Sequence, residues 1–219
     1  EAYYRMLADI SPVICNNYGY YLKFEKNDPY NSLIRYVQAA QKGDPQGAYN
    51  AGYCYENGEA VEEDIHTAYQ FYELAAIAGH PAGQWQIGYY YFNGEGIVEQ
   101  DYAKAAEWLE KAYDNPKSSD NNRVKTAAYL GICYQEGLGV AQDDEVALEY
   151  LQEAEEGIDD LWEPINAMVL NALGVAYAFG RGTEEDIELG YQYFEDAAKL
   201  GSEEAKENLQ YINSPKPRF

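Results

Sequence analysis

The order of apolar and polar positions predicts helices along most of the chain. One run, DIHTAYQFYELAAIAG, carries its apolar side chains at Ala68, Phe71, Tyr72, Ala75 and Ala76. Their spacing is that of a helix which buries one stripe. A shorter aromatic run, AGYCYENG, comes before it and ends in glycine, the residue that adopts a positive φ without strain. The two runs together predict a helix, a tight turn and a second helix.

This helix–turn–helix pattern occurs four times. Each first helix contains a glycine, which we call its phasing glycine, and a tyrosine stands three positions after it. Self-similarity with a period between 20 and 50 residues indicates stacked repeat units. The phasing glycines are Gly52, Gly88, Gly131 and Gly174; the tyrosines are Tyr55, Tyr91, Tyr134 and Tyr177; the turns carry Gly58, Gly94, Gly137 and Gly180, then Ala60, Gly96, Gly139 and Gly182.

Capping residues agree with this periodicity. An aspartate opens each second helix, where its carboxylate can accept hydrogen bonds from free backbone N–H groups. These are Asp64, Asp101, either Asp143 or Asp144, and Asp186. Gly79, Gly157 and Gly201 follow second helices, and we expect all three to close them in the left-handed conformation.

The pattern L/A-G-x-x-Y-x-x-G-x-G-V, followed by Asp and an Ala-Ala run ending in Gly, resembles the Sel-one-like repeat (SLR), a relative of the tetratricopeptide repeat. The resemblance covers about residues 28 to 201. It implies an all-α fold: a right-handed α-solenoid of stacked antiparallel helix pairs, with about five units and a C-terminal capping helix.

We expect a degenerate N-terminal capping repeat, four regular units and a C-terminal closing segment. The capping repeat has lost its G-x-G turn, and its first helix is expected near VICNNYGYYLKF. The closing segment is expected to be a lone helix and a frayed tail, because two prolines end it. The predicted ranges are 1–43 for the cap, 44–79, 80–122, 123–165 and 166–201 for the units, and 202–219 for the closing segment.

Two units are longer than the others by about seven residues. The first insertion, near 114–123, is polar and contains a proline, so we expect an exposed loop. The second, near 156–168, contains Trp162, which either fills a gap in the core or projects as a contact residue. Insertions in repeat arrays map to loops on one face, often the binding face.

The helical repeat predicts which side of each first helix is free. Residues one before and three after the phasing glycine should be buried, and the opposite side carries aromatic and amide side chains. In tetratricopeptide-like solenoids the first helices line the concave surface, so the resemblance implies a groove there. Its predicted residues are Tyr49, Asn50, Tyr53, Asn57, Trp85, Gln86, Tyr89 and Asn93.

Two qualifications accompany this groove. Tyr49 and Trp85 are either groove residues or packing positions of the repeat. The later units carry other residues at the same places, so the aromatic groove is expected in the first half of the chain. These replacements are Ala128, Ile132, Asn171 and Val175.

Charge limits the class of partner. With 38 acidic and 15 basic residues, the net charge is −23. Such a surface repels nucleic acid and anionic lipid and attracts basic partners. The acidity can equally serve only to keep an aromatic-rich surface soluble. We therefore expect a protein or peptide partner, basic if the charge is used, and no nucleic acid.

Cysteine usage does not predict a disulfide framework. Cys54 and Cys133 occupy the same position two units apart, beyond disulfide reach in a stacked array, and Cys15 lies in the degenerate repeat. Reduced thiols favour a cytoplasmic protein, whereas removal of a signal would allow a periplasmic or secreted one. No apolar stretch is long enough to predict a membrane span.

Catalytic and metal-binding patterns are weak. Ser119-Asp120-Asn121 spells one element of the serine β-lactamases, but S-x-x-K and K-T-G are missing. The two histidines, His66 and His80, are predicted in exposed or capping places and have no metal-ligand spacing. We expect no catalytic residue, no metal and no cofactor.

The leading hypothesis is a non-enzymatic adaptor that binds a protein or peptide on its concave face. A narrower alternative, implied by the resemblance, is an immunity protein that neutralises a basic bacterial toxin. A third alternative, a β-lactam hydrolase of the cysteine-rich SLR type, lacks its motifs in this sequence.

Overall fold

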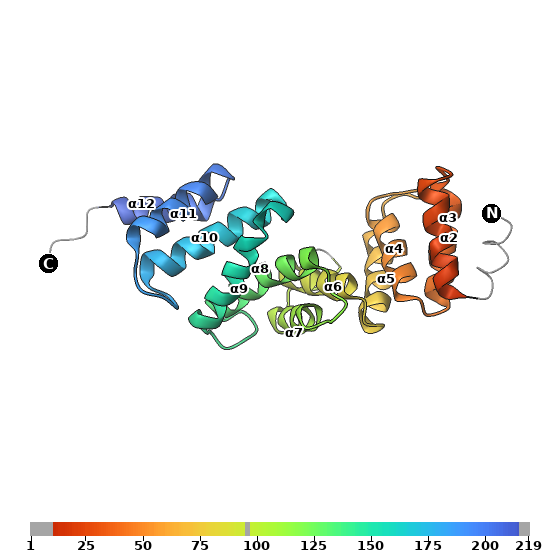
Figure 1. Cartoon of the computed structure of the whole chain (residues 1–219), viewed down its shortest axis with the longest axis horizontal. Helices are drawn as coiled ribbons and strands as arrows, with labels where there is room; N and C mark the ends of the chain where they lie inside the picture. The colour runs from red at the N-terminus through yellow and green to blue at the C-terminus, as the bar shows by residue number, and fades with distance from the viewer. Residues whose placement is uncertain (1–10, 95–96, 215–219) are drawn as a thin grey trace. The chain divides into compact units, whose positions relative to one another are not determined.

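The computed structural model describes residues 11–94 and 97–214, and every regular element within them is helical (Figure 1). These are α2 (Pro12–Phe24), α3 (Pro29–Gln41), α4 (Pro45–Glu56), α5 (Ile65–Ile77), α6 (Pro81–Asn93), α7 (Tyr102–Tyr113), α8 (Asp120–Glu136), α9 (Asp144–Glu156), the short 3-10 helix η1 (Ile158–Asp160), α10 (Glu163–Phe179), α11 (Ile187–Lys199) and α12 (Glu203–Asn213).

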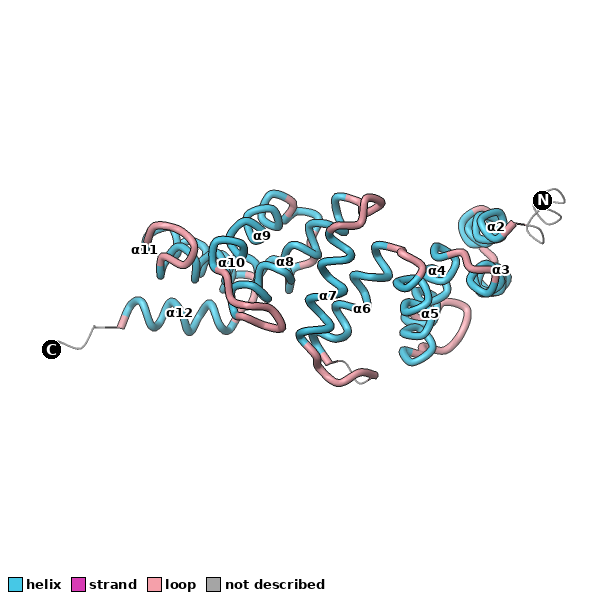
Figure 2. The backbone as a smooth tube through the Cα atoms, turned by 90° about the horizontal axis from the view of Figure 1, so that it is seen from below, coloured by secondary structure: helices cyan, strands magenta, loops and turns pink. Residues whose placement is uncertain are grey.

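The chain divides into two compact units, which we call unit 1 (residues 1–118) and unit 2 (residues 119–219). Unit 1 holds the helix pairs α2/α3, α4/α5 and α6/α7, and unit 2 holds α8/α9, α10/α11 and the single helix α12. In both units the helices of a pair pack side by side, as Figure 2 shows for α6 and α7, and each pair packs on the next. This confirms the predicted α-solenoid class.

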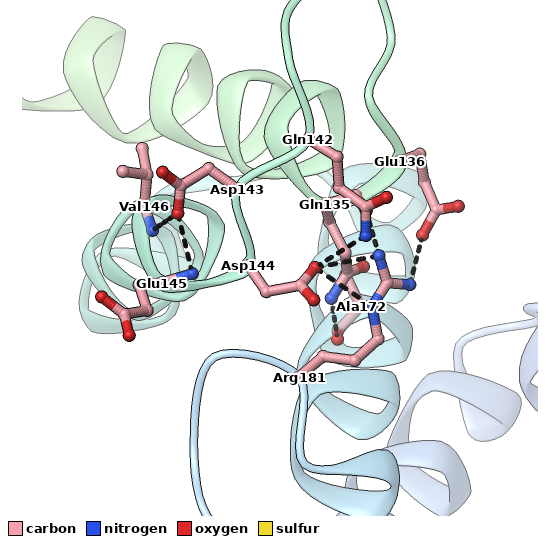
Figure 3. Close-up of polar contacts among 9 residues, drawn as sticks. All are labelled: Gln135, Glu136, Gln142, Asp143, Asp144, Glu145, Val146, Ala172 and Arg181. Atoms are coloured by element: carbon pink, nitrogen blue, oxygen red, sulfur yellow. Dashed lines mark hydrogen bonds and ion pairs between the residues drawn. The ribbon is translucent and has the colours of Figure 1, made fainter.

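Side-chain caps explain where the helices begin. Asp64, Asp101 and Asp186 each accept a hydrogen bond from a backbone N–H in the first turn of their helix, as predicted. Asp143, rather than Asp144, caps α9: its Oδ1 accepts from the N–H groups of Glu145 and Val146 at 3.2 and 3.1 Å (Figure 3). An aspartate at this position offsets unpaired N–H groups and the helix dipole.

The phasing glycines allow close packing between the two helices of a pair. A Cβ atom on Gly52 would lie 2.8 Å from the Tyr72 ring, and one on Gly174 would lie 2.5 Å from the Phe194 ring. A Cβ on Gly19 would meet the Tyr36 ring at 2.8 Å. Gly19 is therefore the phasing glycine of α2, which the sequence analysis did not identify.

The N-terminal pair escaped full recognition because its turn has different chemistry. Eight positions after the phasing glycine, the later pairs turn through glycines with positive φ, such as Gly139 and Gly182. In the first pair, Asn27 occupies that position with a φ of 51°. Asparagine tolerates the left-handed region better than most residues, so a turn can survive without G-x-G. Gly96 lies outside the described residues.

Two predictions about glycine and tyrosine need correction. Gly79 and Gly201 have positive φ, as predicted, but Gly157 has a φ of −106°. Its small size matters instead, because a Cβ there would overlap the side chain of Val124. The tyrosines three positions after the phasing glycines are only half-buried, and three of them stack on a ring of the second helix, as Tyr55 does on Phe71.

The first insertion is not entirely a loop. Helix α8 begins at Asp120 and is 17 residues long, whereas α6 has 13, so part of the insertion lengthens the helix. Ser119 caps α8 by accepting a hydrogen bond at Oγ from the N–H of Asn122 at 3.2 Å. The Ser-Asp-Asn element is thus a helix start. The second insertion forms η1 and lengthens α10, also to 17 residues.

Candidate binding faces of the two units

The predicted groove residues of unit 1 lie on α4 and α6, but they are not equally accessible. Tyr53 is 41% exposed, and Asn57 and Asn93 are exposed as predicted. Gln86 is only 8% exposed, which contradicts its predicted place on an open face. Its Nε2 donates to Oε1 of Glu56 at 3.0 Å, so it serves packing between α4 and α6.

Glu56 is a polar centre that the sequence analysis missed. The hydroxyls of Tyr72 and Tyr90 donate to its carboxylate at 2.7 and 2.8 Å, in addition to Gln86. Burial, followed by the charge of Glu56, raises the pKa of Tyr72 far above its usual range. One carboxylate therefore ties α4, α5 and α6 together. Nothing in the sequence distinguishes this glutamate from the many solvated ones.

The amide side chains of this face are largely engaged within the molecule. Asn57 and Asn93 each donate to the backbone carbonyl four residues earlier, at 2.9 and 3.0 Å, and so close their own helices. Asn50 donates to Oδ1 of Asn16 on α2 at 2.8 Å and accepts from Gln46 at 3.1 Å. These amides stabilise helix ends and helix contacts, and fewer donors than predicted face outward.

The neighbours of Tyr49 and Trp85 show whether each is a groove residue or a packing position. Tyr49 stacks on the His80 ring with centroids 4.8 Å apart and packs 5.5 Å from Tyr72, which is a packing role. Trp85 stacks on Tyr89 at 5.4 Å, and both are half-buried. Among the predicted aromatic residues, Tyr53 is therefore exposed to solvent, and Trp85 and Tyr89 are half-buried and stack on each other.

His80 is the N-terminal cap of α6, one of the two places predicted for the histidines. Its Nδ1 accepts from the N–H of Gly83 at 3.2 Å, and its Nε2 lies 3.0 Å from Oε1 of Gln46. Because Nδ1 must be unprotonated to accept, the neutral ring carries its proton on Nε2. Burial lowers the pKa of His80 to about 4. His66 is exposed in the first turn of α5.

Unit 2 contains an open groove of about 570 Å³ on the corresponding face. It is lined by α8, α10 and the start of α12. We call it the unit-2 groove. Its apolar lining includes Ile132, Met168, Val175 and Leu200, and its polar lining includes Glu136 and Glu204.

Two residues of the groove lining differ from their equivalents in unit 1. Ile132 and Val175 stand one position after their phasing glycines, where unit 1 has Tyr53 and Tyr89. Smaller aliphatic side chains at this position leave space that tyrosine rings occupy in unit 1. From sequence alone these replacements indicate only the loss of an aromatic groove, and the hollow that they line was not predicted.

Polar contacts hold the walls of the unit-2 groove. Gln135 Nε2 donates to the carbonyl of Ala172 at 2.9 Å, which ties α8 to α10, and Asn208 Nδ2 donates to Asn171 Oδ1 at 3.0 Å, which ties α10 to α12. The groove is therefore shaped by side chains on all three helices.

Arg181, in the turn after α10, makes the densest ionic contact of unit 2 (Figure 3). Its guanidinium donates to Asp144 Oδ1 at 3.1 and 3.0 Å, to Glu136 Oε1 at 2.9 Å and to the backbone carbonyl of Gln135. Although burial alone would raise it, the pKa of Asp144 lies below its usual range because of the hydrogen bond from Arg181. This contact fixes Glu136 at the rim of the groove.

Trp162 lies outside the core. It is 53% exposed at the N-terminal cap position of α10, while Leu161 beside it is buried. Of the two alternatives, the structure supports a projecting side chain.

Other features restrict the chemistry of the described residues. Cys15, Cys54 and Cys133 are buried thiols that form no disulfide, and burial raises the pKa of Cys54 to about 11, which keeps its thiol protonated. Within residues 11–94 and 97–214, no group of three His, Cys, Asp or Glu side chains could hold a metal ion. In the same ranges, no helix is long and apolar enough to cross a membrane.

Comparison with known proteins identifies the repeat family of this chain. The family model of the Sel1 repeat matches residues 45–80, 81–116, 124–157 and 167–202, more than half of the chain. A crystal structure of c5321, described as a protective antigen present in uropathogenic Escherichia coli strains displaying an SLR fold, is 28% identical, with a TM-score of 0.65. The alignment covers 92% of this chain and 41% of that one.

A second solved structure shows the same fold. The Sel1 repeat protein from Oxalobacter formigenes is 23% identical, with a TM-score of 0.67, over 93% of this chain and 77% of that one. This chain therefore spans less than half the length of the E. coli protein and about three quarters of the second. No curated protein matches the sequence.

Proposed function

Because the chain belongs to the Sel1 repeat family, whose members are commonly protein–protein interaction scaffolds, we propose that it is a non-enzymatic scaffold that binds a protein or peptide segment in the unit-2 groove. The first-helix face of unit 1, with Tyr53, Trp85 and Tyr89, adds a second contact surface for the same class of partner.

The observation that carries this proposal is the groove itself. A hollow of about 570 Å³ with an aliphatic floor is large enough for several side chains of an amphipathic segment. Burial of apolar side chains there is favourable by about 25 cal/mol per Å², and the part that exceeds the entropy cost of association supplies affinity. These features of the unit-2 groove account for binding without a catalytic step.

The acidic side chains of the groove favour a basic ligand. Glu136 and Glu204 line the groove, and no Lys, Arg or His side chain does. Half of the Glu136 side chain is exposed, so it can pair with a ligand cation although Arg181 also contacts it. The net charge of −23 adds a long-range attraction for basic segments. Binding should therefore weaken as salt increases.

A peptide display experiment tests the proposal. The full chain is used to select from a random peptide library, and we expect sequences in which an aliphatic residue adjoins Lys or Arg. The double variant Ile132→Tyr plus Val175→Tyr fills the hollow with the side chain that unit 1 carries. It should lower affinity for the selected peptides at least tenfold, about 1.4 kcal/mol.

The matched control is Ile187→Tyr, which adds the same ring on the exposed face of α11, outside the groove. It should bind like the unchanged protein. Equal binding by the double variant, with its helical content preserved, would show that the peptides bind elsewhere. Selection of acidic peptides would refute the charge argument.

A further inference from the structure

Helices α2 and α4 expose an aromatic patch in unit 1. Tyr20 and Phe24 on α2 are 58% and 59% exposed, and their ring centroids are 4.4 Å apart. Tyr53 on α4 is 41% exposed. Lys23 Nζ lies 5.3 Å from the Phe24 centroid and 5.2 Å from the Tyr53 centroid, so one ammonium group contacts rings of both helices. We call Tyr20, Lys23, Phe24 and Tyr53 the α2–α4 patch.

The patch has a regular spacing along the repeat. Tyr20 follows Gly19 by one position, as Tyr53 follows Gly52, so the two tyrosines are equivalent residues on neighbouring first helices. Asn50 donates to Asn16 at 2.8 Å, which shows how closely α2 and α4 pack. Packed helix axes are about 8–10 Å apart. One turn of polyproline II helix, three residues at about 3.1 Å each, spans nearly the same distance.

The tyrosine hydroxyls and the Asn17 amide of this surface can donate hydrogen bonds to the carbonyl groups of a ligand backbone. Among the described residues, none bonds to the hydroxyl of Tyr20 or Tyr53 or to Nδ2 of Asn17, which lies one turn before Tyr20. A proline residue has a carbonyl acceptor and no N–H donor. A β-strand ligand would need a sheet edge, and the described residues contain no strand. A rigid proline-rich segment therefore fits these outward donors.

A charged pocket adjoins the patch. It has a volume of about 450 Å³ and is lined by Lys23, Phe24, Asn27, Pro29, Glu59 and Ala60. Oε2 of Glu59 contacts Lys23 Nζ at 2.5 Å, whereas no described residue bonds to Oε1. A basic side chain lying along Phe24 and Pro29 can reach this second oxygen. The acidic character of the whole chain favours the same charge.

We propose that the α2–α4 patch binds a proline-rich segment of another protein in polyproline II conformation, with a Lys or Arg beside the prolines that pairs with Glu59. Proline rings lie on Tyr20, Phe24 and Tyr53, and the tyrosine hydroxyls donate to ligand carbonyls. The preformed helix loses little entropy on binding. This assigns a second ligand chemistry to a surface outside the unit-2 groove.

Fluorescence anisotropy with three labelled peptides tests the proposal on the full chain. The first is an oligoproline ending in Arg, the second has alternate prolines replaced by Gly, and the third ends in Glu. We expect the first to bind at least tenfold more tightly than either of the others. The Gly peptide keeps the charge but loses the polyproline II helix, and the Glu peptide keeps the helix but reverses the charge.

Three variants locate the site. Tyr20→Ala plus Tyr53→Ala should weaken binding of the Arg peptide at least tenfold. Glu59→Gln should lose most of the preference for Arg over Glu. Tyr30→Ala is the control, because Tyr30 is 62% exposed on α3, outside the patch, and it should change nothing.

Three results would overturn the proposal. The first is equal binding of the proline and Gly peptides, and the second is equal binding by the double tyrosine variant with an unchanged circular dichroism spectrum. The third is occupancy by a second copy: residues 214–219 read SPKPRF, and dimers that disappear when 215–219 are deleted would identify this chain as its own ligand. The unit-2 groove variant Ile132→Tyr plus Val175→Tyr should leave oligoproline binding intact, so failure here is separate from failure of the scaffold function.

Discussion

Unit 1 and unit 2 use one helical framework with opposite contents on the first-helix face. In unit 1, Tyr53 and Tyr89 stand one position after the phasing glycine, and in unit 2 the same position holds Ile132 and Val175. The first choice presents rings at the surface, and the second leaves a groove of about 570 Å³. The residue at this repeat position is therefore one of the differences between the aromatic face of unit 1 and the groove of unit 2.

The contacts between successive pairs also differ in polarity. Seven positions after the phasing glycine stands Glu59 in unit 1 and Arg181 in unit 2. Glu59 contacts Lys23 on the preceding first helix, whereas Arg181 contacts Glu136 on its preceding first helix. In both units the residue at this turn position forms an ion pair with the preceding first helix, but the acidic and basic partners are exchanged. Equivalent backbones can be joined by different side-chain chemistry.

The largest expected difference between the units is at the fourth position after the phasing glycine. Glu56→Ala removes an acceptor of three hydrogen bonds and leaves the hydroxyls of Tyr72 and Tyr90 unpaired, so it should destabilise by about 3 kcal/mol. Gln135→Ala removes one bond to the Ala172 carbonyl and should cost about 1 kcal/mol. Urea unfolding measures both. Equal losses would mean that the two positions have equal weight.

The caps of the first helices predict a pH dependence in unit 1 alone. The pKa of His80 falls from its usual 6.5 to about 4 on folding, so between these values the unfolded chain binds more protons. Stability from this group is complete above pH 6.5 and is lost as the pH falls toward 4. Unit 2 caps α8 and α12 with Ser119 and Ser202, which do not titrate.

His80→Asn should remove this dependence, because asparagine caps a helix without titrating. Between pH 7 and pH 5 the unchanged protein should lose about 1–2 kcal/mol more than the variant. Hydrogen exchange measured by mass spectrometry should locate the loss in α6. An identical loss in the variant would place the sensitive group elsewhere.

The ionic contacts between pairs should have smaller and unequal effects. Arg181→Ala breaks several hydrogen bonds to Asp144, Glu136 and a carbonyl, and should destabilise unit 2 by about 1–2 kcal/mol. Lys23→Ala breaks one ion pair between partly exposed groups and removes an ammonium group from the Phe24 and Tyr53 rings, and it should destabilise unit 1 by about 1 kcal/mol. Exchange protection of each unit reports the two losses separately. A larger effect of Lys23 would reverse the comparison.

The smallest expected effect is at Ala60, which has a φ of 70° at a turn position that holds glycine in the later repeats. The left-handed conformation costs a residue with a Cβ roughly 1–2 kcal/mol. Ala60→Gly should relieve this strain. Glycine loses more entropy on folding, which offsets part of the gain, so the net stabilisation of unit 1 should be about 0.5 kcal/mol. Gly139→Ala in unit 2, with a φ of 74°, should do the reverse. Thermal unfolding of both variants checks the sign.

Features that repeat along the chain were predictable from the sequence. The periodic aspartates and the turn glycines gave the helix pairs and most of their caps, because capping and positive φ depend on local chemistry. Gly157 was misread, because its small size serves packing against Val124, and that contact is remote in sequence. The start of α8 was missed because a polar insertion can extend a helix as well as form a loop.

The candidate site was less predictable. Helical spacing alone placed Gln86 on the open face, yet a glutamate 30 positions earlier draws it into the interface between α4 and α6. The unit-2 groove was missed because a hollow depends on what three helices leave unfilled. Tyr20 and Phe24 were missed because the pair that carries them lacks the usual turn, so its register was not found. Sequence periodicity thus describes the framework, whereas partner chemistry depends on contacts between repeats.

The exchanged charges at the seventh position constrain how such a gene can change. If recombination placed the pair α10/α11 directly after α2/α3, Arg181 would lie near Lys23 on the preceding first helix, where it now pairs with Glu136. Duplication that keeps neighbouring pairs together avoids repulsion between these two cations. Neighbouring pairs are thus matched in charge at this contact, and a duplicated block that carries both partners preserves the match.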